Sequence, residues 1–242
     1  ELAQPGIELL RSKGHDVQIS LDLSPDDLFA TIAETDALIV RSATEVDKRL
    51  LDEAHRLQVI GRAGVGLDNV DIATATSRGI LVCNAPESNV VSAAEHSVAL
   101  LLALARNVAQ AHSALTQGRW ERSLWTGTEL LNKTVGIVGL GRVGRLVAQR
   151  LKGFDVRILA FDPFVSSESA RAVNAEMVEL DDLLSQSDFV TVHLPRTPET
   201  VGLFDAERFT KFKPGARLVN AARGGVVIED DLLEALESGH LG

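Results

Sequence analysis

Apolar residues follow two patterns along the 242-residue chain. Short apolar runs between turn residues predict buried strands, and apolar residues at helical spacing predict amphipathic helices. The two patterns alternate from end to end, which predicts parallel sheets covered by helices and therefore an α/β fold. The expected strands are 16–20, 37–40, 58–60, 80–83, 156–161, 177–179, 189–193 and 217–220, together with the apolar run that ends at Gly139.

Several helix ends are marked by their residues. Gly14 and Gly239 follow apolar helical segments and predict C-terminal caps. Ser24-Pro25-Asp26-Asp27 predicts a helix start, because a serine cap, a proline and acidic residues all favour a first turn. Ser92-Ala93-Ala94-Glu95 predicts a second start of the capping-box type, opening a long helix.

The segment Asn84-Ala85-Pro86 interrupts the alternation and predicts a hinge between domains. The first domain would be 1–86 and the second 87–242, the latter opening with the long helix. The second domain contains the most informative stretch of the chain.

That stretch is Gly139-Leu140-Gly141-Arg142-Val143-Gly144, which joins a predicted strand to a predicted helix. Such a turn binds dinucleotides, because Gly139 permits a tight turn, Gly141 lets the backbone approach a pyrophosphate, and Gly144 lets the helix pack closely on the strand. The free N–H groups at the helix start attract phosphate, and Arg142 is placed to reach the pyrophosphate. The strand–turn–helix context predicts a Rossmann domain.

Asp162 ends the next predicted strand, about 20 residues beyond the glycines, where an acidic residue binds the adenosine ribose. Its carboxylate would accept hydrogen bonds from the ribose hydroxyls and repel a 2′-phosphate. The sequence therefore predicts NAD rather than NADP. The alternative is a structural glycine turn followed by a solvated aspartate.

Composition narrows the possible partners. The net charge of −10 argues against nucleic acid or an anionic membrane as the main partner, and no apolar run is long enough to span a membrane. No signal peptide is recognised, and the single Cys83, expected to be a small buried residue in a strand, is consistent with a reducing, cytoplasmic compartment. No metal site is predicted.

Two arginines follow predicted strands in the first domain. Arg41 ends one strand, and Arg62 ends the next, just before Gly64-Val65-Gly66. Ligands of parallel sheets bind at the carboxyl ends of the strands, so these residues predict an anion site, although either arginine alone would be interpreted as a surface charge.

Six motifs together resemble the D-2-hydroxyacid dehydrogenase family, over essentially the whole chain. They are Arg41-Ser42-Ala43-Thr44, Arg62-Ala63-Gly64-Val65-Gly66-Leu67-Asp68-Asn69-Val70-Asp71, Ser92-Ala93-Ala94-Glu95-His96, the glycine stretch 139–144, His193-Leu194-Pro195 and Asn220-Ala221-Ala222-Arg223-Gly224-Gly225. The resemblance is closest to members that oxidise 3-phosphoglycerate in the first step of serine biosynthesis. It implies a Rossmann NAD-binding domain and an incomplete, flavodoxin-like substrate domain.

The resemblance implies roles for individual residues. Arg223 would bind the substrate carboxylate and polarise the C2 carbonyl during catalysis. Arg41 and Arg62 would contact the substrate phosphate, and Val65, Gly66 and Asn89 would contact the rest of the substrate. NAD would be lined by Gly139, Gly141, Arg142, Val143, Gly144, Asp162, Leu194, Ala221, Ala222 and Val65.

The chain departs from the family pattern at its ends. The family's general acid/base is a histidine held by a glutamate, both expected downstream of Gly242, and neither His193 nor His240 matches the catalytic position. The first strand of the substrate domain is also expected upstream. We therefore expect a chain truncated at both ends that turns over very slowly by itself.

Other functions remain open at this point. The substrate could be glyoxylate, hydroxypyruvate or D-lactate, or the chain could belong to an NAD-sensing protein resembling the family's transcriptional corepressors. The long helix and the segment containing Trp120 and Trp125 suggest a homodimer or homotetramer, although the tryptophans could equally be ordinary surface residues.

Overall fold

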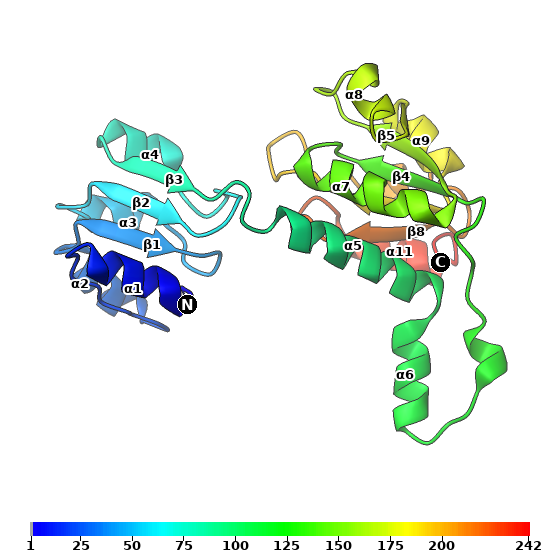
Figure 1. Cartoon of the computed structure of the whole chain (residues 1–242), viewed down its shortest axis with the longest axis horizontal. Coiled ribbons are helices and arrows are strands. Elements are labelled where there is room, and N and C mark those ends of the chain that lie inside the picture. The colour runs from blue at the N-terminus through cyan, green and yellow to red at the C-terminus, as the bar shows by residue number, and fades with distance from the viewer. Residues whose placement is uncertain (1) are drawn as a thin grey trace. The chain divides into compact units, whose positions relative to one another are not determined.

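The computed structural model describes residues 2–242, which fold as two compact units, residues 2–89 and 90–242 (Figure 1). Both are α/β units with parallel sheets, so the predicted fold class is confirmed. The boundary between the units follows Asn89, whereas the sequence places it after Pro86.

The first unit contains a parallel sheet in the order β1-β2-β3. Its strands are β1 (Ala37–Val40), β2 (Val59–Arg62) and β3 (Leu81–Asn84), and its helices are α1 (Gln4–Ser12), α2 (Pro25–Ile32), α3 (Lys48–Glu53) and α4 (Ile72–Ser77). Val40, Arg62 and Asn84 are paired in register, so all three strands end at one edge of the sheet. The predicted caps of this unit are confirmed: Gly14 follows α1 with φ +87°, and Ser24 accepts a hydrogen bond from Asp27 N–H.

The predicted strand 16–20 is wrong, because this segment contains no strand. Ile19 is 46% exposed, so its apolar side chain gains little from burial. A strand also needs a neighbour for its backbone groups, and Val17 carbonyl instead accepts a hydrogen bond from the Arg11 guanidinium at 3.2 Å.

One face of the three-stranded sheet is uncovered among the described residues. Val40 and Ile60 point into the core, whereas Ile39 is 45% exposed and Leu81 is 61% exposed on the other face. Cys83 lies on this same face of the sheet and is exposed, so its predicted burial is wrong. The strand pattern alone predicted two covered faces, as in most parallel sheets.

The second unit contains a five-stranded parallel sheet in the order β6-β5-β4-β7-β8. The strands are β4 (Thr134–Val138), β5 (Arg157–Phe161), β6 (Ala175–Met177), β7 (Phe189–Val192) and β8 (Arg217–Asn220). The helices are α5 (Val90–Ala105), α6 (Val108–Thr116), α7 (Arg142–Leu151), α8 (Ser167–Arg171), α9 (Leu180–Gln186), α10 (Ala206–Phe209) and α11 (Glu229–Glu237), with 3₁₀ turns η1 (Arg122–Trp125) and η2 (Lys152–Phe154). Strand β6 begins two residues earlier than the predicted 177–179, and the other strands lie where the apolar runs predict them.

Two buried clusters cover the two faces of this sheet. Leu101 of α5 and Val147 of α7 belong to one cluster, and Leu183 of α9 and Phe209 of α10 belong to the other. The unit is therefore a three-layer, doubly wound fold of the Rossmann type.

The predicted capping box at Ser92 is wrong. Helix α5 begins at Val90, so Ser92 and Glu95 lie inside the helix, and the Glu95 N–H that a Ser92 cap would bind already has a helical partner. The Glu95 carboxylate instead pairs with Arg150 of α7 at 3.1 Å. Helix α5 therefore begins before the start that local residues predict.

Helix α5 ends near Asn107, which adopts a left-handed conformation with φ +52°. Helix α6 then leaves at 66°, and together with η1 it forms an arm that extends away from the sheet (Figure 1). No single helix among residues 2–242 is long and apolar enough to cross a membrane, and α5 and α6 reach that length and composition only as a bent pair.

Candidate functional site

The second unit has a topological switch beside β4. The chain runs from β4 to β5 and β6 on one side of the sheet, then returns to β7 and β8 on the other side. Val138, Phe161 and Val192 are paired in register, so the loops after β4, β5 and β7 begin at one edge. In open α/β sheets the ligand crevice lies at this edge, where the strand order reverses.

The three glycines after β4 have different surroundings. Gly139 has φ +96°, and a Cβ there would lie 2.9 Å from the His193 carbonyl group. A Cβ on Gly144 would lie 2.1 Å from the Gly139 carbonyl oxygen, which shows how closely α7 packs on the loop. Gly141 has no atom within 4 Å of its Cβ position, so the space beside it is open in the protein itself.

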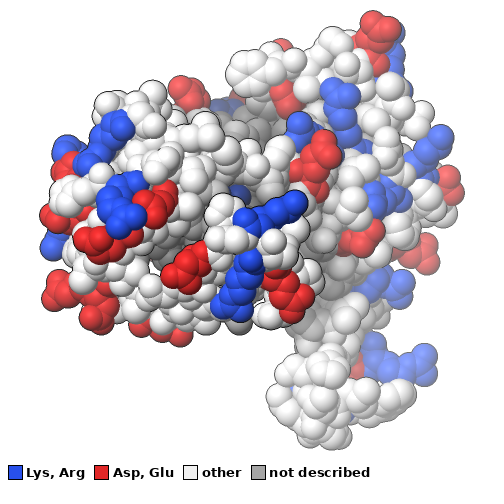
Figure 2. All heavy atoms as spheres, turned by 60° about the vertical axis from the view of Figure 1, so that its left-hand side comes forward, with Lys and Arg blue, Asp and Glu red and all other residues white. Residues whose placement is uncertain are grey.

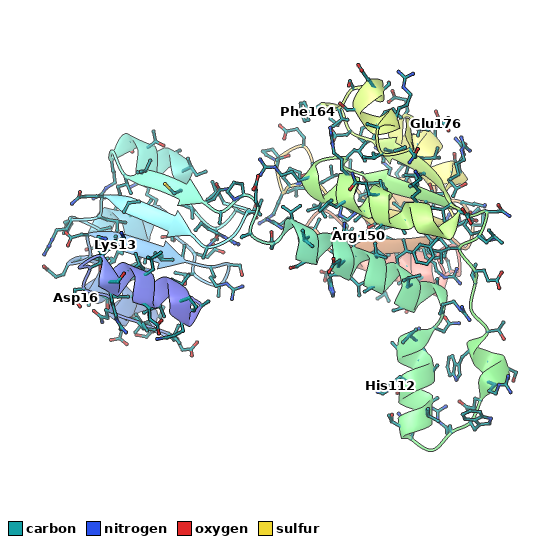
Figure 3. The ribbon with its side chains drawn as sticks, in the orientation of Figure 1. Lys13, Asp16, His112, Arg150, Phe164 and Glu176 are labelled. Carbon is teal, nitrogen blue, oxygen red and sulfur yellow. The ribbon has the colours of Figure 1, made fainter. Side chains whose placement is uncertain are left out.

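Asp162 follows β5 and holds the glycine loop. Its Oδ2 accepts a hydrogen bond from Leu140 N–H at 2.9 Å, and its Oδ1 accepts one from Phe164 N–H at 2.9 Å. Both carboxylate oxygens keep further lone pairs, so these bonds orient the carboxylate and leave it able to accept a hydroxyl. Phe164 itself is 95% exposed at the loop surface (Figure 3).

The remaining predicted cofactor residues of this unit lie at the same edge. Arg142 is exposed in the first turn of α7, and Val143 is half-buried against the core. Leu194 follows β7, and Ala221 and Ala222 follow β8. The geometry brings these residues to the strand ends around the glycine loop.

Arg223 lies on a turn that the side chain of Asn220 organises. Asn220 Oδ1 accepts a hydrogen bond from Ala222 N–H at 3.1 Å, and its Nδ2 donates to the Arg223 carbonyl at 3.0 Å. The Arg223 guanidinium is half-buried and donates to the Ala222 carbonyl at 2.8 Å. Asn220 belongs to the motif around Arg223, but the sequence analysis assigned it no role.

A hollow of about 630 Å³ lies at the strand ends of the first unit. Arg41, Arg62 and Asn89 line it, together with Ala63, Gly64, Ser88 and the residues Leu2, Ala3 and Gln4 at the start of α1. The structure thus brings together three of the predicted substrate residues. Val65 and Gly66 lie on the adjoining loop and do not line the hollow.

Arg62 is the most constrained cation of this hollow. Its Nη1 donates to the Ala63 carbonyl at 3.3 Å, and its Nε is buried without a hydrogen-bond partner among the described residues. A Cβ on Gly64 would lie 1.5 Å from Nη1, so the guanidinium could keep this position only beside a glycine. A buried, unsatisfied N–H is costly, so the position favours an anionic ligand.

Two asparagines shape the loops of this hollow, and the sequence analysis assigned neither of them a role. Asn69 is buried and donates from Nδ2 to the carbonyls of Arg41 and Thr44 at 2.7 and 2.6 Å. Asn84 donates to the Val65 carbonyl at 2.7 Å. An amide residue directly before the apolar Val70 and shortly after a glycine loop is the signal that could have identified Asn69.

His193 lies beside the glycine loop. Burial lowers the pKa of His193 from 6.5 to about 4, so its imidazole is neutral at pH 7. Its Nε2 is 3.1 Å from Thr191 Oγ1. Residues 2–242 contain no cluster of three or more metal-ligating side chains.

The arrangement after β4 and β5 fits NAD on structural grounds. The open space beside Gly141 accommodates a group that a Cβ would exclude, and the start of α7 provides free N–H groups for a pyrophosphate. The oriented carboxylate of Asp162 lies at the position of a ribose ligand.

Comparisons with known proteins agree with this geometry. Residues 98–242 match the family model for the D-isomer specific 2-hydroxyacid dehydrogenase, NAD binding domain. The D-3-phosphoglycerate dehydrogenase of Mycobacterium tuberculosis is 54% identical over 216 residues, which cover 89% of this chain and 41% of that protein. The chloroplastic D-3-phosphoglycerate dehydrogenase 2 of Arabidopsis thaliana is 49% identical, covering 99% of this chain and 38% of that protein.

Solved structures show the same relationship. The NAD-dependent formate dehydrogenase of Staphylococcus aureus, solved with NAD, superposes with a TM-score of 0.90 at 38% identity, covering 98% of this chain and 72% of that one. The chain spans about two fifths of the length of the two curated relatives named above. It belongs to the D-isomer specific 2-hydroxyacid dehydrogenase family, with an NAD-binding domain in its second unit.

Proposed function

We propose that this chain supplies the cofactor-binding and substrate-binding parts for NAD-dependent oxidation of 3-phospho-D-glycerate to 3-phosphohydroxypyruvate, the first step of serine biosynthesis. The observation that carries the proposal is the hollow containing Arg41 and the buried, unsatisfied Nε of Arg62. Similarity to D-3-phosphoglycerate dehydrogenases supports the same substrate.

Each part of the substrate has a proposed ligand. Arg41 and Arg62 bind the phosphate, since guanidinium groups match phosphate oxygens in charge and geometry. Asn89 and the backbone of Val65 and Gly66 contact the remainder of the substrate. Arg223 binds the carboxylate and polarises the C2 carbonyl in the reverse direction, on the turn that Asn220 organises.

NAD, when bound, would supply the hydride acceptor for C2 of the substrate, and the proton of the C2 hydroxyl would pass to a general base. The role of this chain is to orient the cofactor: the start of α7 and Arg142 bind the pyrophosphate, and Asp162 binds the adenosine ribose. Val143, Leu194, Ala221 and Ala222 provide apolar walls. His193 has no catalytic role in this proposal.

The test compares two substrates that differ only in the phosphate. We expect the full-length gene product to have a higher kcat/KM for 3-phosphoglycerate than for D-glycerate. Arg62→Ala should lower that ratio by roughly 10- to 100-fold, because a hydrogen bond to a charged group contributes about 1.5–3 kcal/mol. Arg56→Ala is the matched control, since Arg56 pairs with Glu34 and Asp36 on the surface of the same unit.

An unchanged ratio in Arg62→Ala would contradict the phosphate site. Preference for glyoxylate, hydroxypyruvate or D-lactate in the wild-type protein would assign another activity of the family. NADH-dependent binding of a partner protein without turnover would instead indicate a sensing protein.

We also propose that the arm mediates assembly into a homodimer or homotetramer. Leu115, Trp120 and Leu124 are 55%, 75% and 64% exposed, and the arm carries few charged side chains where it projects at the bottom of Figure 2. Trp125 Nε1 is buried without a hydrogen-bond partner among the described residues. Light scattering of wild type and Trp120→Asp tests this, and a wild-type monomer would contradict it.

A cytoplasmic location belongs to the same proposal, as the reducing compartment suits a chain with one thiol.

A further inference from the structure

Arg145 binds two carbonyl groups of the glycine loop, those of Leu140 and Gly141. It lies in the first half of α7, and its Nε donates a hydrogen bond of 3.1 Å to the Leu140 carbonyl. Its backbone N–H donates a hydrogen bond of 3.0 Å to the Gly141 carbonyl. One residue therefore holds two consecutive carbonyls, those of Leu140 and of the second glycine, Gly141.

The same loop is also held through the N–H group of Leu140. Leu140 N–H donates to Asp162 Oδ2 at 2.9 Å, and the Leu140 side chain is fully buried. The residue between the first two glycines thus has its N–H, its carbonyl and its side chain all engaged by the protein. The flexible backbone that glycines allow is restrained to one conformation.

We propose that Arg145 is a positioning residue for the cofactor pyrophosphate, and this inference rests on the proposed cofactor site at Gly139–Gly144. With the Leu140 and Gly141 carbonyls bound by Arg145, these two oxygens do not compete with the ligand for the N–H groups that open α7. The two Nη atoms of Arg145 make no hydrogen bond to any residue from 2 to 242, so the guanidinium also adds positive charge beside the helix start.

The alternative is a purely structural role, in which Arg145 only fastens α7 to the sheet. Arg150 provides the matched control for that role. It lies on the same helix (Figure 3), donates to the Leu146 carbonyl at 3.3 Å, and pairs with Glu95 of α5. Both arginines link α7 to its surroundings, but only Arg145 contacts the loop.

The experiment measures binding of ADP and of adenosine to the chain by NMR titration, in wild type, R145M and R150M. ADP probes the pyrophosphate site and adenosine probes the ribose and base sites. We expect R145M to weaken ADP binding about tenfold, as expected for loss of one charge-assisted hydrogen bond, and to change adenosine binding less than about twofold. R150M should change neither affinity.

A spectroscopic signature tests the contact itself. The Gly141 nitrogen shares a peptide group with the Leu140 carbonyl, so loss of the hydrogen bond should shift the Gly141 ¹⁵N resonance in ligand-free R145M and leave it in place in R150M. An unshifted resonance overturns the proposal.

The binding results separate this inference from the cofactor site. Equal ADP affinity in wild type and R145M, or equal losses for ADP and adenosine, overturns the role of Arg145 while leaving the cofactor site intact. A wild-type chain that binds adenosine and ADP with the same affinity overturns both proposals, because no pyrophosphate site is then present.

Discussion

Leu140 N–H donates a hydrogen bond of 2.9 Å to the carboxylate of Asp162, across the ends of two neighbouring strands. The carboxylate that is placed for the cofactor ribose therefore also holds the loop that is placed for the pyrophosphate. Leu140 is fully buried, so its N–H has no access to bulk water as a substitute partner. If both residues bind the cofactor as proposed, we expect binding of its two halves to be coupled through this bond.

Removal of the Asp162 carboxylate should affect both stability and cofactor choice. We expect Asp162→Ala to destabilise the second unit by about 1–3 kcal/mol, because a buried N–H loses its acceptor. Asp162→Asn keeps one acceptor oxygen and should retain most of the stability, yet it no longer repels a 2′-phosphate. Melting curves and the ratio of NADH to NADPH affinities measure the two effects. Wild-type discrimination in Asp162→Asn would count against a ribose-binding role.

Two glycines of the loop should respond differently to alanine. In Gly144→Ala the new Cβ meets the Gly139 carbonyl oxygen at 2.1 Å, a backbone atom that cannot move without shifting the loop. We expect a lower melting temperature. In Gly141→Ala the Cβ meets no protein atom within 4 Å, so the chain should melt as wild type but bind NADH more weakly. The reverse pattern would show that the open space beside Gly141 does not receive the ligand.

Acid should weaken the second unit partly through His193. Burial lowers the pKa of His193 from 6.5 to about 4, so below pH 6.5 the unfolded chain takes up a proton that the folded chain resists. The free energy of unfolding is therefore unaffected by this group above pH 6.5 and falls as the pH drops toward 4. The contribution reaches about 3 kcal/mol, at 1.36 kcal/mol for each pH unit.

The measurement is denaturant unfolding of wild type and His193→Gln between pH 7 and pH 4. Their stability difference should change across this range in favour of the variant as the pH falls. His112→Gln is the control, because His112 is exposed on α6 of the same unit (Figure 3). Parallel pH profiles for wild type and His193→Gln would contradict the effect of burial.

Cys83 should react readily with a thiol reagent in the native chain. It lies on the uncovered face of the three-stranded sheet and is exposed, and the chain contains no other cysteine. We expect DTNB to modify one thiol at a rate close to that of the denatured chain, measured by absorbance. A native rate far below the denatured rate would show that this face is covered in solution.

Local sequence predicted the elements whose ends depend on neighbouring residues. The boundaries of β1 match its apolar run, and Ser24 caps α2 through the Asp27 N–H, because a cap and a first turn lie only a few residues apart. The predicted capping box at Ser92 is wrong because α5 begins at Val90. Ser92 and Glu95 both lie within the helix, and the Glu95 carboxylate pairs with Arg150 of α7 instead.

Burial on the sheet of the first unit could not be predicted from local residues. The alternation of Val82 and Cys83 shows which residues point to opposite faces, but not whether another element covers each face. The predicted strand 16–20 depended in the same way on a neighbour, and no strand forms there.

The sequence by itself determined the order and type of the elements, the glycine turn and the acidic residue after the next strand, because these follow from periodicity and from conformations that glycine permits. Only the tertiary structure decided what those residues touch. It placed Arg62 with a buried, unsatisfied Nε beside Gly64, and joined Leu140 to Asp162 and Arg145. Such contacts depend on which strand ends become neighbours, and spatial order in a sheet is set by packing of the whole unit rather than by local residues.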